Sequence, residues 1–254
     1  MKISFWSYKG GTGRTIALAN VAVELVRRGR NVGMVDLDLD APGLYLLFGK
    51  DREEINKRGH LIDILQSKSI GIISSLIMDI TLPGSFQSSK GRLYLLPSIN
   101  TPTLDRLKFD DEMFIFMSQV TDEFIKIFRL DYLLIDTRTG FSIFSGLGHF
   151  LSKLIIVTFR PDLQDTEGVK EAIKTFEYHS QNFKLVCTPV PNLPEKSERL
   201  KKAERLLEKK ISVCVDLEPR LLLEEELLIV TNPTSPASES YRKIADHIEG
   251  VEND

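Results

Sequence analysis

The feature that most constrains this chain is a glycine-rich segment near its start, Tyr8-Lys9-Gly10-Gly11-Thr12-Gly13-Arg14-Thr15. It follows a short apolar strand candidate over residues 3–7 and leads directly into an apolar helical pattern over 16–28. Where a strand turns into a helix in this way, backbone N–H groups converge and the helix dipole adds partial positive charge. Glycines there leave room for an anion. The segment therefore predicts a phosphate-binding loop.

Two positions in this loop are unusual. The general pattern of such loops is G-x-x-x-x-G-K-[ST], in which the hydroxyl residue holds Mg²⁺. Thr15 fills that hydroxyl position, but Arg14 stands where a lysine is expected, and an extra lysine, Lys9, precedes the glycines. Arginine keeps the charge on a larger, planar group, so we expect nucleotide binding to survive. Hydrolysis stays open, because a misplacement of about 1 Å can lower a rate a hundredfold.

Strand and helix patterns alternate along the chain. Apolar strand candidates cover 31–38, 92–97, 132–136, 154–159 and 185–188, and helical patterns cover 110–129, 166–179, 195–210 and 238–248. We expect Pro189, Pro191 and Pro194 to break the 185–188 strand. Continuous apolar strands suit a parallel sheet that is covered on both faces. The sequence thus predicts one α/β domain over 1–254, with a doubly wound, mostly parallel sheet and helices on both faces.

The region 50–91 is the hardest to interpret, and we treat it as a variable region or an insertion. We expect a polar loop over 51–59, a short helix over 60–66, and either helix or strand over 70–80. The stretch 83–91 has the composition of a turn or loop.

Composition excludes several classes of protein. The chain has 254 residues, 42% hydrophobic and 27% charged, with a net charge of −3. That balance indicates neither a nucleic-acid nor a membrane partner, and no apolar run approaches the roughly 20 residues that span a bilayer. We see no signal peptide and expect a cytoplasmic protein. Cys187 and Cys214 show no metal or redox spacing and suggest reduced, buried thiols.

Three acids follow the apolar strands. Asp36, Asp38 and Asp136 lie at predicted strand ends, at the same edge of the sheet as the glycine loop. Carboxylates there can hold Mg²⁺ directly or through water, and can orient an attacking water. With a phosphate-binding loop beside them, they supply the parts that phosphoryl transfer requires.

These motifs resemble the MinD/ParA class of P-loop ATPases, which carry a deviant Walker A motif of the form K-G-G-x-G-K-[ST]. The matching stretches are 9–13 with Thr15, the acidic pair in 35–38, the strand and acid in 131–137, and the C-terminal 236–245. Gly13-Arg14-Thr15, with 38–44 and 136–140, resembles more narrowly a KGGxGR branch of ParA-like proteins found in bacterial signalling and conflict systems. The resemblance implies a P-loop NTPase fold.

The resemblance also implies ATP, Mg²⁺ and a homodimer that forms on ATP binding. Lys9 would reach the partner's phosphates, Asp38 would position the attacking water, and Arg14 would join them as a catalytic residue. Thr15, Asp36 and Asp136 would hold Mg²⁺. The nucleotide contacts would be Lys9, Gly10, Gly11, Thr12, Gly13, Arg14, Thr15, Ile16 and, from the proline-containing stretch 189–192, Asn192. Arg138 could serve the phosphates or pair with Asp38 or Asp40.

Three functions remain open at this point. The first is an ATP-driven dimerisation switch that hydrolyses slowly and acts on an unknown protein partner. The second is a nucleotide-sensing scaffold that no longer hydrolyses ATP. The third is a small-molecule kinase or synthetase on the same fold. DNA binding would depend on the 195–210 helix alone, which contains seven Lys/Arg and four Glu. We expect that helix to present a solvated face instead.

Overall fold

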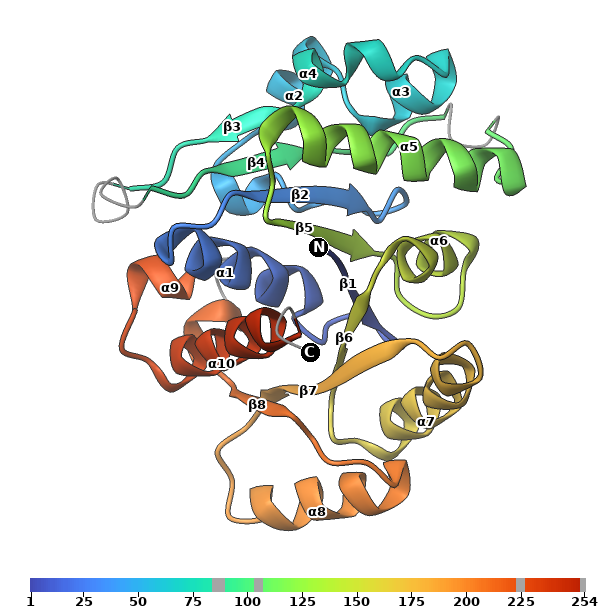
Figure 1. Cartoon of the computed structure of the whole chain (residues 1–254). Helices are drawn as coiled ribbons and strands as arrows, with labels where there is room; N and C mark the ends of the chain where they lie inside the picture. The colour runs from blue at the N-terminus through green and yellow to red at the C-terminus, as the bar shows by residue number, and fades with distance from the viewer. Residues whose placement is uncertain (84–89, 103–106, 223–226, 252–254) are drawn as a thin grey trace.

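An eight-stranded sheet runs through the whole molecule (Figure 1). The computed structural model describes residues 1–83, 90–102, 107–222 and 227–251. The strand order is β3-β4-β2-β5-β1-β6-β7-β8, and every neighbouring pair is parallel except β3 with β4. The strands are β1 Lys2–Ser7, β2 Val32–Leu37, β3 Met78–Ile80, β4 Leu93–Leu96, β5 Tyr132–Thr137, β6 Leu154–Phe159, β7 Asn182–Val190 and β8 Val213–Asp216.

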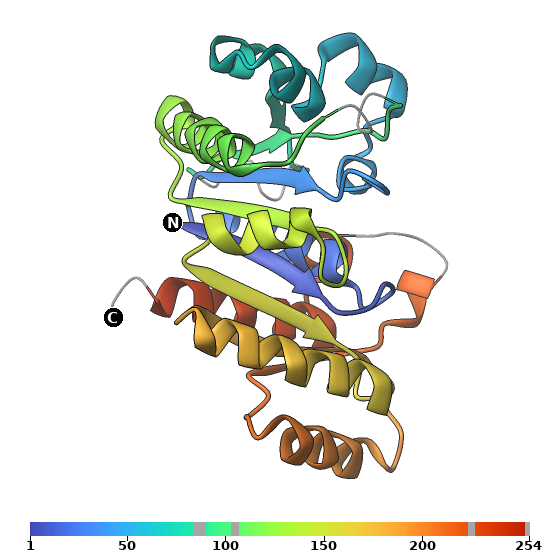
Figure 2. The ribbon, with the colours of Figure 1, turned by 90° about the vertical axis from the view of Figure 1, so that its right-hand side faces the viewer.

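Helices cover both faces of this sheet (Figures 1 and 2). One face carries α1 Arg14–Arg27, α9 Leu228–Thr231 and α10 Pro236–Gly250, and the other carries α5 Asp111–Phe128, α6 Ile143–Leu151, α7 Leu163–Tyr178 and α8 Lys196–Leu207. The region after β2 adds α2 Arg52–Arg58, α3 Leu61–Ser67 and α4 Ile73–Leu76. Short 3-10 turns are η1 Leu46–Phe48, η2 Ile70–Ile72 and η5 Pro219–Leu222. The doubly wound, mostly parallel fold is therefore confirmed.

The core explains why the central strands read as continuous apolar runs. Every residue of β2, β5 and β6 is buried, because helices pack on both faces of these strands. Alternate residues of one strand reach opposite cores: Met34 contacts the core under α1, and Val35 contacts the core under α5. Within the described ranges, no helix has both the length and the apolar composition needed to cross a bilayer.

The expected polar loop over 51–59 is wrong, because most of it forms α2. The Asp51 carboxylate caps this helix by accepting a hydrogen bond from the Glu54 N–H at 2.8 Å. Acids occupy the first turn and bases the last, which suits the helix dipole. Only Ile55 is buried, so the helix gives almost no apolar periodicity that a sequence reader could detect.

The remainder of the variable region mixes short elements. The predicted helix over 60–66 is confirmed as α3, and 70–80 contains both alternatives, a helical part followed by the edge strand β3. β3 pairs antiparallel with β4, with Met78 opposite Leu95. Most of the expected 83–91 loop lies outside the described residues.

Proline did not end β7 where expected. The strand continues through Pro189 to Val190, and its pairing with β8 is irregular between Cys187 and Val190. Proline is tolerated at such an irregularity because no regular ladder hydrogen bond is lost there. The elements α6 and β8 were not predicted. α6 begins at a serine cap, in which Ser142 Oγ accepts from the Ser145 N–H at 3.1 Å.

A buried carboxylate joins α1 to α10. Glu24 is fully buried and accepts hydrogen bonds from Arg27 at 2.7 Å and from Arg28 at 2.8 Å. Arg28 also contacts Glu249 on α10 at 2.8 Å, and Arg242 Nε lies 3.8 Å from Glu24. Burial alone would raise the pKa of Glu24, but the bonds from Arg27 and Arg28 lower it. Glu24 is thus held in its charged form.

We expect Glu24→Gln to lower the free energy of unfolding by about 2 kcal/mol at neutral pH, the usual worth of hydrogen bonds to a charged group. The difference from wild type should be present above the unfolded-state pKa of about 4.3. It should be lost as the pH falls through the lower folded-state pKa. Urea unfolding across pH 3–7 measures both. The control, Glu53→Gln, removes one partner of an exposed pair with Lys57 and should cost less than about 0.5 kcal/mol. An equal, pH-independent loss in both variants would contradict this account.

Candidate phosphate-binding site

The glycine-rich loop lies at the carboxyl ends of the central strands. In Figure 2 the arrowheads of the central parallel strands point to one side, and the loop after β1 lies there. β2 and β5 pair so that Asp36 stands beside Asp136, and Asp38 follows directly after β2. The prediction that these three acids share an edge with the loop is confirmed. Ligands of open α/β sheets bind at this edge.

Backbone geometry explains the glycines of the loop. Gly11 and Gly13 have φ of 72° and 71°, in the left-handed region where glycine carries no steric cost. Gly13 caps α1, and its carbonyl accepts from the Ala17 N–H at 2.8 Å. A Cβ added at Gly10 or Gly11 would meet nothing within 4 Å, so this side of the loop is open space. Beneath the loop, Thr12 Oγ1 lies 3.1 Å from Thr158 Oγ1, which fixes the loop to β6.

Arg14 is the centre of the charged cluster. Its side chain is only 7% exposed; Nε donates to Asp136 Oδ1 at 2.6 Å and Nη2 donates to Asp38 Oδ2 at 2.9 Å. The third nitrogen, Nη1, is buried and has no hydrogen-bond partner among the residues that the structure describes. Burial acts to lower the pKa of Arg14, but the Asp136 and Asp38 carboxylates outweigh it and raise the pKa. Arg14 therefore stays charged, with one donor unused.

Asp36 and Asp136, the carboxyls at the two strand ends, are buried side by side, and among the described residues only Asp136 is paired with a cation. Asp36 accepts backbone N–H bonds from Asp38, Gly43 and Leu44. No lysine or arginine of the described residues pairs with it. Burial, and next the charge of Asp136, raise the pKa of Asp36 well above its ordinary value. Burial also raises the pKa of Asp136, although Arg14 and Thr15 act in the opposite direction. A cation beside this pair would relieve its repulsion.

The same pair decides how a metal could be held. Thr15 Oγ1 donates to Asp136 Oδ2 at 2.7 Å, so the hydroxyl and one carboxyl already touch. Across the part of the chain that the structure describes, no three His, Cys, Asp or Glu side chains are grouped to bind a metal by themselves. Mg²⁺ keeps several waters in most protein sites and is completed by phosphate oxygens. Thr15, Asp36 and Asp136 fit that partial role.

Lys9 and Asn192 lie apart from this cluster. Lys9 Nζ donates to Gln164 Oε1 at 2.6 Å and lies 3.6 Å from Asp162 Oδ1, so it rests on the start of α7. Asp162 is also the cap of α7. Asn192 is exposed on the loop after β7. Thr188, in β7 before that loop, is nearer to the glycine-rich loop than Asn192 is. Its Oγ1 would lie 3.7 Å from a Cβ at Gly13.

Of the two acids considered for Arg138, its contacts select Asp40. Arg138 Nη1 forms an ion pair with Asp40, not with Asp38. The Asp40 carbonyl also accepts from Asn100 Nδ2 at 2.7 Å. Arg138 therefore shapes the loop after β2 and leaves Asp38 to Arg14.

Sequence reasoning missed the residues that hold the loop after β5 against β1. Gly140 has φ of 70°; its N–H donates to the Ser7 carbonyl at 2.9 Å, and its own carbonyl accepts from Trp6 Nε1 at 2.8 Å. The ring of Tyr8 packs on Gly168 of α7, where an added Cβ would come within 2.1 Å of it. Only the Thr139-Gly140 pair hinted at this in the sequence. The loop after β5 is therefore held against β1, and the start of the glycine-rich loop is held against α7.

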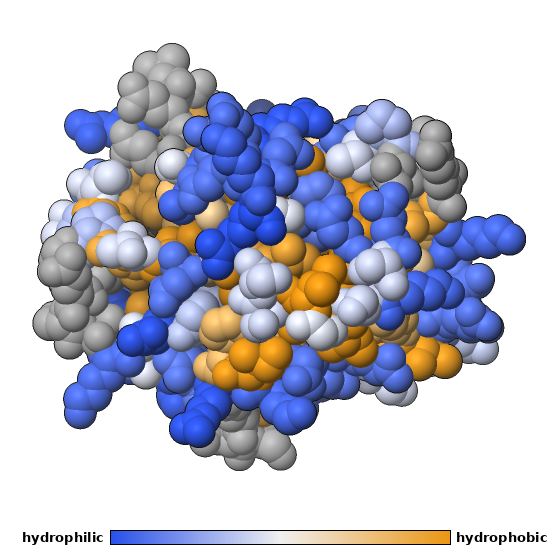
Figure 3. Space-filling model, turned by 90° about the horizontal axis from the view of Figure 1, so that it is seen from above, coloured by the Kyte–Doolittle hydropathy of each residue, from blue (hydrophilic) through white to orange (hydrophobic). Residues whose placement is uncertain are grey.

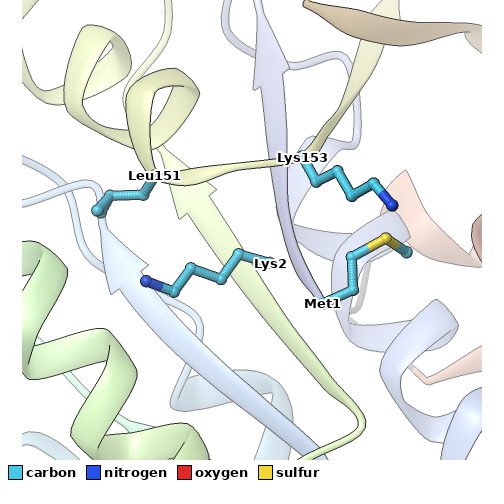
Figure 4. A pocket seen from close by; sticks show the side chains of 4 residues that line it. All are labelled: Met1, Lys2, Leu151 and Lys153. Atoms are coloured by element: carbon cyan, nitrogen blue, oxygen red, sulfur yellow. The ribbon is translucent and has the colours of Figure 1, made fainter. Parts of the chain in front are cut away.

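One surface hollow lies away from this edge. It has a volume of about 580 Å³ and is lined by Met1, Lys2, Leu151 and Lys153 at the beginnings of β1 and β6, the opposite end of the sheet (Figure 4). Lys2 there pairs with Asp122 at 2.8 Å. Figure 3 shows the face over α3 and α4, where hydrophilic residues alternate with hydrophobic patches. The unpaired Nη1 of Arg14 lies at the edge of the sheet that carries the glycine-rich loop.

Comparison with known proteins gives a consistent result. A family model described as ParA, NUBPL iron-transfer P-loop NTPase, matches residues 1–82. The chain is 31% identical over 202 residues to a ParA family protein of Mycoplasma pneumoniae, covering 74% of this chain and 70% of that protein.

Two solved structures share the fold. The septum site-determining protein MinD of Pyrococcus horikoshii, complexed with Mg-ADP, has a TM-score of 0.75 at 21% identity, covering 99% of this chain and 96% of that one. The MinC:MinD cell division complex of Aquifex aeolicus has a TM-score of 0.78 at 18% identity, covering 98% and 95%.

We expect Gly168→Ala to displace Tyr8 and with it the start of the loop. Overpacking of this kind costs about 1–3 kcal/mol, measured as a fall in the free energy of unfolding. Gly146→Ala is the matched control, because Gly146 also lies in a helix and an added Cβ meets nothing within 4 Å. That control should be neutral or stabilising, since alanine favours helix. Equal effects of the two substitutions would refute the close Tyr8–Gly168 contact.

Proposed function

Because the chain belongs to the ParA/MinD family of P-loop NTPases, we propose that it binds ATP and Mg²⁺ at the Gly10–Thr15 loop and dimerises around the nucleotide. The observation that carries this proposal is the buried Arg14 Nη1, which lies beside an open loop and has no partner in the described part of the chain. A buried unpaired donor is costly, and a phosphate oxygen would satisfy it. Arginine is well suited to that contact, because its planar guanidinium matches phosphate geometry.

The loop and its helix complete the anion site. Backbone N–H groups of Gly10 to Gly13 stand at the N-terminus of α1, where the helix dipole favours negative charge. No acidic side chain occupies the first turn of α1 to oppose an anion. We assign the phosphates to Lys9, Gly10, Gly11, Thr12, Gly13, Arg14, Thr15 and Ile16, and leave Asn192 as the base contact.

The acids supply the place for Mg²⁺. Thr15 would hold it directly, and Asp36 and Asp136 through water. This would explain two neighbouring buried carboxyls of which, among the described residues, only Asp136 contacts an arginine. When bound, Mg²⁺ neutralises charge on the phosphates. Asp38 is the acid left to position a water, and its only basic partner among the described residues is Arg14 at 2.9 Å.

Hydrolysis then depends on whether Arg14 stays bound to Asp38 when a phosphate is present. In the structure its Nη2 donates to Asp38 Oδ2 at 2.9 Å, so this carboxylate is held by an arginine as well as offering acceptor sites to a water. Binding of a phosphate at Nη1 would draw the guanidinium toward the nucleotide and weaken its bond to Asp38. This supports slow turnover, stimulated by a protein partner that shifts the loop. We place that partner in a bacterial signalling or conflict system.

Lys9 is the residue that would join two copies. Its contacts with Gln164 and Asp162 are partly exposed, and exposed pairs contribute only about 0–1 kcal/mol. Release from α7 is therefore inexpensive, and the ammonium could reach the phosphates of a second copy. In the relatives, MinD of Aquifex aeolicus was solved in complex with MinC, so protein partners are known in the family.

The second candidate is a nucleotide-sensing scaffold without hydrolysis. The observation that favours it is the same Arg14–Asp38 bond. If that bond persists with ATP present, binding and dimerisation occur but no water is activated.

We expect ATP with Mg²⁺ to double the molar mass of the wild-type protein in light scattering after size exclusion. Lys9→Ala should keep ATP affinity within a few-fold and lose the mass change, because Lys9 serves the partner's phosphates. Lys153→Ala, at the opposite edge of the sheet, removes the same charge and should behave as wild type. A wild-type mass that ATP leaves unchanged would end the dimer proposal.

We expect Asp38→Asn to lower ATP turnover by a hundredfold or more while ATP still binds, in line with loss of a positioned catalytic carboxylate. Steady-state phosphate release and fluorescent-ATP titration measure the two quantities. Equal and negligible release from wild type and Asp38→Asn, with intact binding, would select the scaffold instead.

A further inference from the structure

The two cysteines, far apart in the sequence, are neighbours in the sheet. Cys187 on β7 and Cys214 on β8 are direct partners in the parallel register. Both contact the core cluster under α7 and α8, so their side chains lie on the same face of the sheet. Both are free thiols. The absence of a redox spacing in the sequence was therefore misleading, because the spacing is created by the pairing of β7 with β8.

The register places the pair within reach of a covalent bond. Neighbouring strands lie about 4.7–4.9 Å apart. Disulfides form between residues whose Cα atoms are about 4.4–6.8 Å apart. Little backbone movement would be needed to join the two thiols.

The two thiols differ in access and in acidity. Cys187 is fully buried, whereas Cys214 is partly exposed and lines a groove of about 480 Å³ between α8 and β8, with Lys196 and Leu200. The hydrogen bond with Cys187 lowers the pKa of Cys214, and Lys196 lowers it further. Contact with Cys214, and next burial, raise the pKa of Cys187. Redox-sensitive pairs have this division: an accessible, acidic thiol beside a second one that resolves it.

We propose that Cys187 and Cys214 are a peroxide-reactive dithiol, in which Cys214 is the attacking cysteine and Cys187 the resolving one. This modification site is separate from the nucleotide proposal and does not depend on it.

The reaction balances with hydrogen peroxide as the oxidant. The Cys214 thiolate attacks one peroxide oxygen and the O–O bond breaks, which leaves Cys214 sulfenic acid and a hydroxide that takes up a proton. The sulfur of Cys187 then attacks the sulfenic sulfur. The S–S bond forms, the S–O bond breaks, and the leaving hydroxide takes the Cys187 thiol proton and departs as water. The dithiol is oxidised by two electrons, and one peroxide is reduced to two waters.

The location gives the bond a structural consequence. Thr188, next to Cys187, lies against the Gly13 position of the phosphate loop. After β8, the Leu217 N–H donates to the Val190 carbonyl at 2.8 Å. A disulfide would thus tie the edge strand β8 to β7 one residue before the segment that borders the loop.

The test is mass spectrometry of the folded, full-length chain after hydrogen peroxide. The protein is denatured and blocked with N-ethylmaleimide, and intact mass and peptides are compared with an untreated sample. We expect the loss of two hydrogens, no maleimide on either cysteine, and one linked peptide pair containing Cys187 and Cys214. Dithiothreitol should restore both thiols. Two maleimides after peroxide, a sulfinic acid on Cys214 without the linked pair, or a disulfide between two chains would each overturn the proposal.

Two variants separate the roles of the thiols. Cys187→Ser should leave Cys214 sulfenic acid that dimedone traps, because no second thiol resolves it. Cys214→Ser should leave Cys187 unoxidised, because it is fully buried. Dimedone on Cys187 instead would reverse the assignment. The wild-type peptide pair decides the central point even where a variant fails to fold.

Discussion

The buried guanidinium of Arg14 is the interaction on which the site depends. The parallel register of β2 and β5 sets Asp36 beside Asp136, and two buried carboxylates cannot both ionise there without a nearby cation. Arg14 supplies a cation to one of the two from the first residue of α1, at 2.6 Å from Asp136, and it also lies 2.9 Å from Asp38. Removing one partner from a buried pair typically costs about 3–5 kcal/mol, because a charge is left unpaired. The strand ends, the loop and α1 are thereby held as one unit.

The contacts of Arg14 show how an arginine differs from the lysine that the general loop pattern has at this position. A lysine ammonium is a compact point charge, whereas Arg14 has enough donors to bind two carboxylates and still keep Nη1 for a phosphate. The cost is that Asp38 becomes engaged. In the proposed function, nucleotide binding and water activation therefore both involve the Arg14 side chain.

Much of the fold and the site could be predicted from the sequence. The continuous apolar strands that end in Asp36 and Asp136, and the glycine loop before a helix, are local sequence patterns. In a parallel sheet the carboxyl ends of the strands lie at one edge, so these patterns were enough to place the acids beside the loop. Errors arose where long-range pairing decides. α2 buries only Ile55, so its helix leaves no periodic pattern, and Pro189 stays in β7 because the β8 register slips beside it. The choice of Asp40 over Asp38 for Arg138, and the meeting of the two cysteines, likewise depend on contacts between distant segments.

The central claim is that the unused donor of Arg14 is kept for a nucleotide phosphate. A crystal structure with a non-hydrolysable ATP analogue and Mg²⁺ tests it most directly. We expect a phosphate oxygen within hydrogen-bond distance of Arg14 Nη1, with the guanidinium shifted from Asp38. We also expect Mg²⁺ beside Thr15. A nucleotide bound at another edge of the sheet, or an Arg14 that still holds both Asp38 and Asp136 and touches no phosphate, would contradict the account.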